Sequence, residues 1–230
     1  MIQACSMDDQ VTFHAIHNLI RPFRDVVQVK WSQTGFVSGQ LHETPRNLMA
    51  FKDGTVNPRH TDEYKDYVFI NDGWAKNGTY CIIRRIQIHI ETWDRTALEE
   101  QEATFGRKRQ SGAPLTGKKE FDELDLKAKD SSGQYVIPED AHARLAHEAK
   151  TSIKRRAYNY VAGTNEKTGA LETGLLFICF QKSTQQFIDI QNHLGHKDKL
   201  NEYITHRASA TFIVLPGVKK GGYLGETLFD

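Results

Sequence analysis

One carboxylate, Asp53, lies in the part of this sequence that is best suited to acid–base chemistry. Residues 47–58 read NLMAFKDGTVNP, and Gly54 and Asn57 mark turns directly behind an apolar run. The apolar side chains favour burial, so Asp53 is expected on a loop held against them. A carboxylate in such surroundings is a candidate general acid or base. The alternative is an Asx-type turn in which Asp53 only caps the backbone.

A histidine, His142, is the second candidate. Its neighbours Ala141 and Ala143 are small and leave room for a large group beside the imidazole. A single histidine can equally be a surface residue or a satisfied core residue. His147 follows five positions later, so the two rings do not share a helix face as the ligands of a helical zinc site do. No set of thiolates supports zinc binding either.

A pair of arginines, Arg155 and Arg156, lies in a segment that reads as a strand. Adjacent strand residues point to opposite faces, so one of the two should face inward. A buried arginine requires an anionic partner or ligand. A salt bridge with one of the 29 acidic residues is the alternative. The apolar stretch from Leu175 to Phe177 could line a cavity or simply fill a core.

The first 35 residues should provide part of a small α+β unit. The pattern predicts a strand over residues 2–5, a helix that is capped by the pair Asp8-Asp9 and runs up to Pro22, and a strand over residues 25–31. The chain begins as if in the middle of a strand, which suggests a missing upstream part.

The remaining elements follow a recognisable order. We expect an irregular, polar segment over residues 60–74 and little periodicity over residues 107–137. The regular elements expected are a strand over 79–91, a helix after Asp94 or Thr96, a short helix over 142–148, strands over 153–160 and 174–181, a helix from the Ser183 capping box to Gly195, a short segment over 200–204 and a strand over 208–215.

This order predicts an α+β fold built from ferredoxin-like units of the dimeric α+β barrel type. The second unit is complete and the first is truncated to its C-terminal half. The expected division is residues 1–58, with the Asp53 loop, and residues 59–230.

Composition narrows the class of protein. The formal net charge of +1 provides no overall attraction to nucleic acid. No apolar segment is long enough for a membrane span, and the first residues lack the features of a signal peptide. The cysteines, Cys5, Cys81 and Cys179, lie in apolar surroundings without metal-site or redox spacing, which predicts three buried thiols.

Four segments, taken in order, resemble the dye-decolorizing (DyP-type) haem peroxidases. Residues 47–58 resemble the Gly-x-x-Asp-Gly signature of that family, with Ala50 in place of the first glycine. Residues 141–146 resemble its proximal haem-ligand segment, and residues 155–160 its distal-arginine strand. Residues 173–177 resemble the strand that follows. The chain is most similar to the branch of secreted iron-uptake peroxidases, or deferrochelatases, and lacks an N-terminal part that the family has.

The resemblance implies a role for each matching residue. His142 would be the proximal ligand of the iron of haem b (iron protoporphyrin IX). Asp53 and Arg155 would stand on the distal face, where hydrogen peroxide binds, and Arg155 would also contact the cofactor. Leu175 and Phe177 would line that face.

A further residue, Glu202, matches a carboxylate that in the family often bonds the proximal histidine. Such a partner makes the imidazole a stronger donor.

Three functions follow as alternatives. The first is reduction of hydrogen peroxide coupled to oxidation of bulky, phenolic or dye-like small molecules. The second is a deferrochelatase that binds haem and releases or transfers its iron. The third is a ferredoxin-like binding domain without haem. The family also implies self-association into a homo-oligomer and, through its branch, an extracytoplasmic location.

Overall fold

The computed structural model describes residues 1–39, 42–195 and 197–229. The chain forms two compact units, Met1–Thr34 and Gly35–Asp230. The Asp53 loop therefore belongs to the second unit, whereas the sequence analysis had grouped it with the first through a division at residue 58.

The first unit contains the expected helix. Helix α1 spans Asp9–Ile20, and the side chain of Asp8 caps it by accepting hydrogen bonds from the backbone N–H groups of Gln10 and Val11 at 2.7 and 3.2 Å. A 3-10 helix, η1, follows over Arg21–Phe23. The capping residue and the stop before Pro22 are thus confirmed.

The two strands expected in this unit are wrong. Residues 2–5 and 25–31 form no strand, and Val26 and Trp31 are 79% and 52% exposed. The pattern of β-branched residues favours an extended chain. A strand, however, also needs a neighbouring backbone to complete its hydrogen bonds, and no described residue of this unit supplies one.

The second unit is built on one antiparallel sheet. Its strands are β1 (Thr79–Ile88), β2 (Lys154–Arg155), β3 (Tyr158–Thr164), β4 (Leu171–Gln181) and β5 (Ile204–Val214). The order is β2-β4-β1-β5, and β3 also pairs with β4. This order, with a helix in each crossover, is that of a ferredoxin-like unit, as the sequence predicted.

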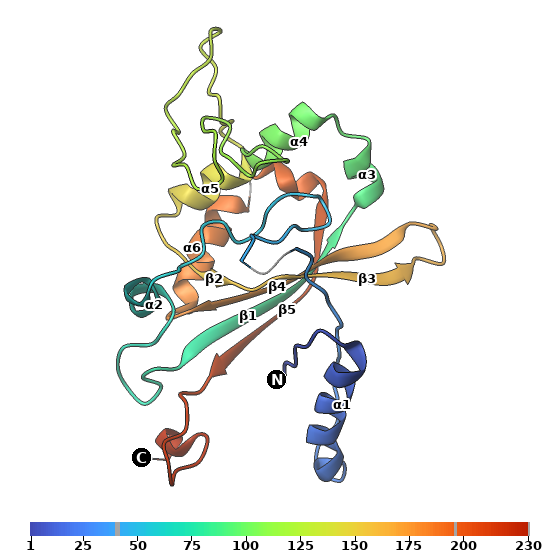
Figure 1. Cartoon of the computed structure of the whole chain (residues 1–230), viewed down its shortest axis with the longest axis vertical. Coiled ribbons are helices and arrows are strands. Elements are labelled where there is room, and N and C mark those ends of the chain that lie inside the picture. Colours follow the sequence, from blue (N-terminus) through green and yellow to red (C-terminus); the bar gives the residue numbers. More distant parts are fainter. Residues whose placement is uncertain (40–41, 196, 230) are drawn as a thin grey trace. The chain divides into compact units, whose positions relative to one another are not determined.

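The helices of this unit are α2 (Thr61–Tyr67), α3 (Ile90–Asp94), α4 (Leu98–Phe105), α5 (His142–Glu148), α6 (Thr184–Leu194) and the 3-10 helices η2 (Lys199–Glu202) and η3 (Glu226–Leu228). Helices α3, α4, α5 and α6 lie on one side of the sheet, and the C-terminal segment with η3 lies apart from them (Figure 1). Phe187 and Ile190 of α6 pack on Ile82 and Cys179 of the sheet. The short helix at His142 and the Ser183 capping box are both confirmed.

Several expected boundaries are corrected. Strand β1 ends at Ile88 rather than at residue 91, because His89 caps helix α3, which begins at Ile90. Helix α4 begins after Ala97, without a side-chain cap from Asp94 or Thr96. The segment over 60–74 contains α2, and the strand expected over 153–160 is divided into β2 and β3.

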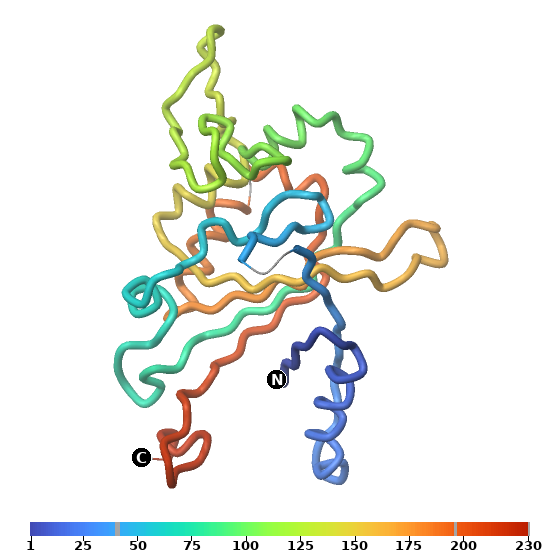
Figure 2. The backbone as a smooth tube through the Cα atoms, in the orientation of Figure 1, coloured from blue at the N-terminus to red at the C-terminus, as the bar shows by residue number. Residues whose placement is uncertain are grey.

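Residues 107–137 form the long segment without helices or strands in Figure 2. This segment does not lie entirely on the surface, because Ala113 and Ile137 are fully buried. Two isolated β-bridges, Arg107 with Pro114 and Lys129 with Tyr135, connect its backbone.

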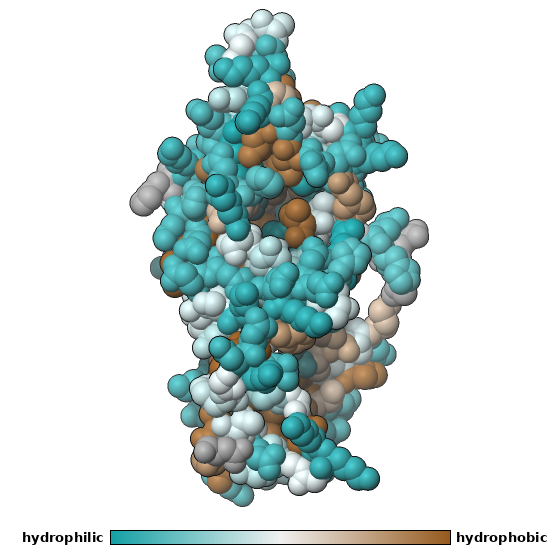
Figure 3. All heavy atoms as spheres, turned by 90° about the vertical axis from the view of Figure 1, so that its left-hand side faces the viewer, coloured by the Kyte–Doolittle hydropathy of each residue, from teal (hydrophilic) through white to brown (hydrophobic). Residues whose placement is uncertain are grey.

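The surface of the molecule is mostly hydrophilic on the face drawn in Figure 3, with apolar side chains in small groups between polar ones. Among the described residues, no helix has both the length and the apolar character that a membrane crossing requires.

The cysteines differ from the expectation at one position. Cys81 and Cys179 are buried in the sheet, but Cys5 is exposed, and none of the three is in a disulfide. Burial raises the pKa of the Cys81 thiol to about 11 and that of Cys179 to about 12.

These values lead to a prediction about thiol reactivity. Because the thiolate is the reactive form, a disulfide reagent should modify Cys5 of the native protein and leave Cys81 and Cys179 unmodified. Mass spectrometry should find one modified thiol per chain before unfolding and three after it. Modification of Cys179 in the native protein would show that the sheet opens.

Candidate functional site

The loop that carries Asp53 is held in a tight hairpin by its own polar groups. The side chain of Asn47 accepts hydrogen bonds from the backbone N–H groups of Met49 and Phe51 at 3.0 and 3.2 Å. Arg46 pairs with Lys52 across the hairpin. The Asx-type turn of this segment is therefore made by Asn47, which leaves the carboxylate of Asp53 available for other contacts.

Ala50 stands at the tip of this hairpin with φ +67°, in the left-handed region that favours glycine. The family signature has glycine here, and the sequence analysis identified Ala50 as a departure from it. The backbone geometry explains why glycine fits better at this position: the Cβ of an L-residue is crowded when φ is positive.

We therefore expect Ala50→Gly to stabilise the protein. Removing the left-handed alanine should gain about 0.5–1 kcal/mol after the larger chain entropy of unfolded glycine is subtracted. This corresponds to a rise in Tm of roughly 2–4 °C for a domain of this size. Calorimetry would measure it, with Ala103→Gly, inside α4, as the control that lowers Tm.

Asn57 fixes the other end of the loop to strand β2. Its side-chain amide donates to the carbonyl oxygen of Arg155 at 2.9 Å, and its Oδ1 accepts from the N–H of Arg155 at 2.8 Å. Gly54 has φ +106°, and a Cβ there would lie 2.9 Å from Nδ2 of Asn57. The Asp-Gly-x-x-Asn spacing thus places Asp53 directly beside the arginine.

Asp53 and Arg155 form an ion pair, with Oδ1 and Nη2 3.2 Å apart. The two side chains are only 13% and 24% exposed. Oδ1 of Asp53 is buried and accepts no hydrogen bond from a described residue. Arg156, by contrast, is exposed and donates to the hydroxyl of Tyr158 at 2.8 Å. Arg155 is thus the arginine that faces inward.

Leu175 and Phe177 lie on the same face of the sheet as Arg155. Arg155 pairs with Cys179, and residues 175, 177 and 179 point to one side of β4. Leu175 packs against the cluster that contains Phe51 of the loop. Phe177, on the same face, packs instead in the cluster that contains Phe187 of α6.

His142 begins helix α5 and is held by a carboxylate. Its Nδ1 lies 2.7 Å from Oδ2 of Asp198, whose side chain is almost fully buried. The other carboxylate oxygen, Oδ1, accepts from the N–H of Leu200 at 3.0 Å and so caps η2. No described residue bonds to Nε2 of His142, and this nitrogen is free to accept a ligand.

The carboxylate partner of His142 is Asp198, which corrects the expectation for Glu202. Glu202 lies at the end of η2 and is exposed. Both acidic residues belong to the same short segment, and nothing in the sequence distinguishes them. The backbone contact from the N–H of Lys199 to the carbonyl oxygen of Asp140, 3.1 Å, places the start of η2 beside α5.

Aromatic contacts connect the Asp53 loop with the histidine helix. Phe51 stacks on Phe105 with ring centroids 4.0 Å apart, and Phe105 meets the ring of His142 edge-on at 6.2 Å. Trp93 packs against Phe51 at 5.9 Å, and its Nε1 donates to the carbonyl oxygen of Met49 at 3.3 Å. This packing fixes the loop and α5 in one rigid arrangement.

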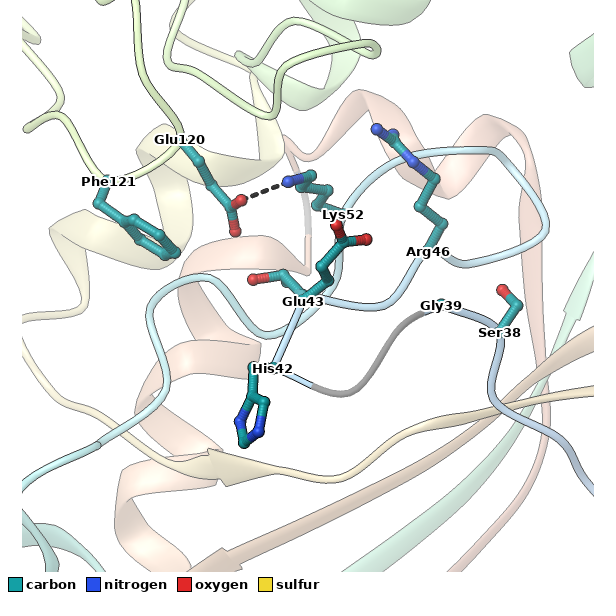
Figure 4. Close-up of a pocket in the computed structure, with 9 residues that line it drawn as sticks. Ser38, Gly39, His42, Glu43, Arg46, Lys52, Glu120 and Phe121 are labelled. Atoms are coloured by element: carbon teal, nitrogen blue, oxygen red, sulfur yellow. Dashed lines mark hydrogen bonds and ion pairs between the residues drawn. The ribbon is translucent and has the colours of Figure 1, made fainter. Parts of the chain in front are cut away.

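The structure also shows a polar cavity beside the loop, which sequence reasoning missed. It has a volume of about 390 Å³, and Lys52 and Glu120 form an ion pair in its wall (Figure 4). Burial alone would raise the pKa of Glu120, but hydrogen bonds from Lys52, Thr44 and Thr55 outweigh it and hold the pKa below its usual range. No sequence signal pairs residues 68 positions apart.

The donor set fits a haem. The described residues contain no group of three or more His, Cys, Asp or Glu side chains able to hold a metal ion. A porphyrin brings four nitrogen ligands of its own, so that a single histidine with an open Nε2 is sufficient as the protein ligand to its iron. The open Nε2 of His142 is the atom that would hold such a group, and the carboxylate of Asp53, paired with Arg155, is the group that would meet its ligand.

The fold and the site together define a class of protein. It is a ferredoxin-like α+β protein that has a carboxylate-bound histidine with an open Nε2 and a separate carboxylate–guanidinium pair, Asp53 with Arg155. Comparison with known families specifies it further. The model of the C-terminal part of the Dyp-type peroxidases matches residues 44–219, and that of the N-terminal part matches residues 1–37. The chain belongs to the Dyp-type peroxidase family, which is a haem-binding family.

Curated relatives include proteins named deferrochelatase. The chain is 36% identical to those of Yersinia pseudotuberculosis and Escherichia coli strain UTI89, over 100% and 99% of its length. It spans only 56% and 57% of those relatives.

Solved structures are also similar. A DyP-type peroxidase from Cellulomonas bogoriensis is 36% identical, with a TM-score of 0.91, and the match covers 98% of this chain and 65% of that one. Ferric DtpA from Streptomyces lividans is 34% identical, with a TM-score of 0.91 and coverage of 96% and 63%.

Proposed function

We propose that this chain is the catalytic part of a haem-dependent peroxidase that reduces hydrogen peroxide. The proposal rests on one observation, that the structure forms two pairs of side chains: His142 with Asp198, and Asp53 with Arg155. His142 is oriented by Asp198 with its Nε2 open, and Asp53 is held against Arg155 by an ion pair through its buried Oδ1. His142 would hold the iron of haem b through Nε2.

The distal pair has the groups that peroxide reduction requires. When bound, the haem supplies the electrons that reduce peroxide. The carboxylate of Asp53 can accept a proton from one peroxide oxygen and return it to the other. Arg155, which stays protonated, stabilises the negative charge that develops on the departing oxygen. Asn57 holds the arginine backbone so that the two side chains remain in register.

On the other side, Asp198 orients the imidazole. A carboxylate on Nδ1 fixes the tautomer and makes Nε2 a stronger donor to iron, which favours the oxidised metal. Because Oδ1 of Asp198 is engaged by the backbone of η2, the carboxylate cannot turn away from the ring.

The second candidate function is that of a deferrochelatase, which would release or transfer iron from haem. The names of the curated relatives favour it. The same residues would serve both reactions. The third candidate, a binding domain without haem, leaves the open Nε2 of His142 unexplained.

The experiment that tests the proposal is a haem titration followed by two assays on the loaded protein. The proposal expects a saturable Soret band and peroxide-dependent oxidation of a bulky phenol or dye. Recovery of free protoporphyrin and iron without peroxide turnover would favour the deferrochelatase. Protein that remains colourless would overturn both.

Other properties of the whole protein belong to the same proposal. Its reductants are bulky, phenolic or dye-like small molecules, or haem itself in the second function. Self-association is supported by the many exposed apolar residues of the first unit, such as Phe13 and Val26. An extracytoplasmic location is supported only by the similarity to the secreted branch of the family.

A further inference from the structure

A carboxylate that belongs to neither pair of the site, Glu120, holds the Asp53 loop on both sides of Asp53. Its Oε2 accepts a hydrogen bond from Nζ of Lys52, the residue before Asp53. Its Oε1 accepts from the hydroxyl of Thr55, two residues after Asp53, at 3.1 Å. The side chain of Glu120 is 10% exposed, and Thr55 is buried. One largely buried carboxylate thus connects the loop to the segment over residues 107–137.

The surroundings of Glu120 fix its backbone and leave space for the contact. The carbonyl oxygen of Glu120 accepts from Nη1 of Arg107 at 3.0 Å, and the same Nη1 donates to the carbonyl oxygen of Gly112 at 2.8 Å. Gly112 has φ +75°, and a Cβ there would lie 2.7 Å from Cδ of Lys52 and 3.4 Å from Cγ of Glu120. A side chain at position 112 would therefore separate Lys52 from Glu120.

The carboxylate of Glu120 is held in its ionised form. Burial raises the pKa of this group, but the hydrogen bonds from Lys52, Thr44 and Thr55 together lower it below the usual range. Hydrogen bonds to an ionised carboxylate are stronger than those to a neutral acceptor. Because the pKa is lowered by folding, the contact is present above the ordinary pKa of glutamate and is lost only as the pH falls through the lowered value.

The Asp53 loop needs such an anchor on its far side. The N–H of Asp53 donates to the carbonyl oxygen of Pro45 at 2.8 Å, which holds the backbone where Asp53 begins. Gly54 follows with φ +106°, and glycine leaves the backbone free to turn at this point. Thr55 is the next residue, so its bond to Glu120 limits where the carboxylate of Asp53 can lie relative to Arg155.

We propose that Glu120 is a positioning residue, which holds Asp53 against Arg155 in the place from which its carboxylate carries a proton between the two oxygens of peroxide. The inference rests on the proposed function. Both oxygens of Glu120 are engaged by the loop, so it acts through the loop rather than on peroxide itself. Moving a reacting group by about 1 Å can lower a rate by about 10²-fold.

The test begins with hydrogen exchange of the haem-free protein. Glu120→Gln keeps the size of the side chain and puts an amide where the carboxylate accepts from Lys52. Amide exchange over residues 47–58 should become faster in this variant, while exchange in β1 and β4 stays as in the wild type. Glu123→Gln removes an exposed carboxylate from the same segment and should change neither.

The second measurement is the peroxide rate of the haem-loaded protein. Glu120→Gln should lower kcat/KM for peroxide by about 10- to 100-fold without changing haem affinity. In the Asp53→Asn background the same substitution should have almost no further effect, because the residue that Glu120 positions is already inactive. A substitution that only weakened the fold would lower the rate by the same factor in both backgrounds. Thr55→Val removes the second donor and should show the same dependence on Asp53.

The outcomes separate this inference from the proposed function. If the wild-type protein binds no haem, or if Asp53→Asn has full peroxide activity, the proposed function fails and the inference with it. If Asp53→Asn is impaired but Glu120→Gln leaves the loop exchange or the rate unchanged, the proposed function stands and the role of Glu120 is overturned. An equal loss in both backgrounds, or a loss of haem affinity, also overturns it. Thr55→Val provides the same comparison if Glu120→Gln folds poorly.

Discussion

Replacing His142 by alanine is expected to abolish the Soret band of the haem-loaded protein. Nε2 of this residue is the proposed protein ligand to iron, and the alanine side chain has no atom that could replace it. The measurement is a visible absorption titration of the purified variant with haem, together with circular dichroism to verify that α5 is retained. The circular dichroism control is needed because His142 is half-buried, and its removal leaves the buried carboxylate of Asp198 without its imidazole partner.

Two matched variants make this result specific. His147→Ala removes an exposed histidine from the last turn of the same helix and should leave the titration unchanged. Asp198→Asn should lower haem affinity by about 10- to 100-fold, the usual cost of removing a carboxylate that orients a metal-binding histidine. Glu202→Gln should have no such effect. An intact Soret band in His142→Ala, or a larger loss in Glu202→Gln than in Asp198→Asn, would contradict the assignment.

Loss of either member of the distal pair should reduce peroxide turnover strongly while haem remains bound. For Asp53→Asn we expect kcat/KM for peroxide to fall by about 10²- to 10³-fold, because the amide cannot carry the proton between the two oxygens. Arg155→Leu should fall by a similar factor, since the developing charge loses its stabilising cation. Stopped-flow absorption of the loaded variants with peroxide would measure both rates.

The adjacent arginine provides the control for this prediction. Arg156→Leu changes the same residue type one position away, on the exposed side of the strand, and should leave the rate unchanged. The double variant Asp53→Asn, Arg155→Leu should lose less than the product of the two single losses, because the residues are in contact and act together. Full peroxide activity in Asp53→Asn would exclude this carboxylate as the proton carrier.

The sequence by itself determined the local elements and their order. Asp8 as a helix cap, the Ser183 capping box and the short helix at His142 depend on side-chain contacts within a few residues, so their patterns are readable directly. The order of strands and helices from Thr79 onward was enough to predict the ferredoxin-like sheet. The inward orientation of one of two adjacent arginines followed from the alternation of strand side chains.

Only the tertiary structure decided which distant groups meet. It selected Asp198 rather than Glu202 as the partner of His142, showed Asn57 bonded to the backbone of Arg155, and paired Lys52 with Glu120.

The same dependence on distant partners removed the strands expected over residues 2–5 and 25–31. Both a strand and a catalytic pair are completed by groups that come from elsewhere in the chain. Several chemically equivalent groups are available for each, and the sequence does not specify which of them the fold brings within hydrogen-bonding distance.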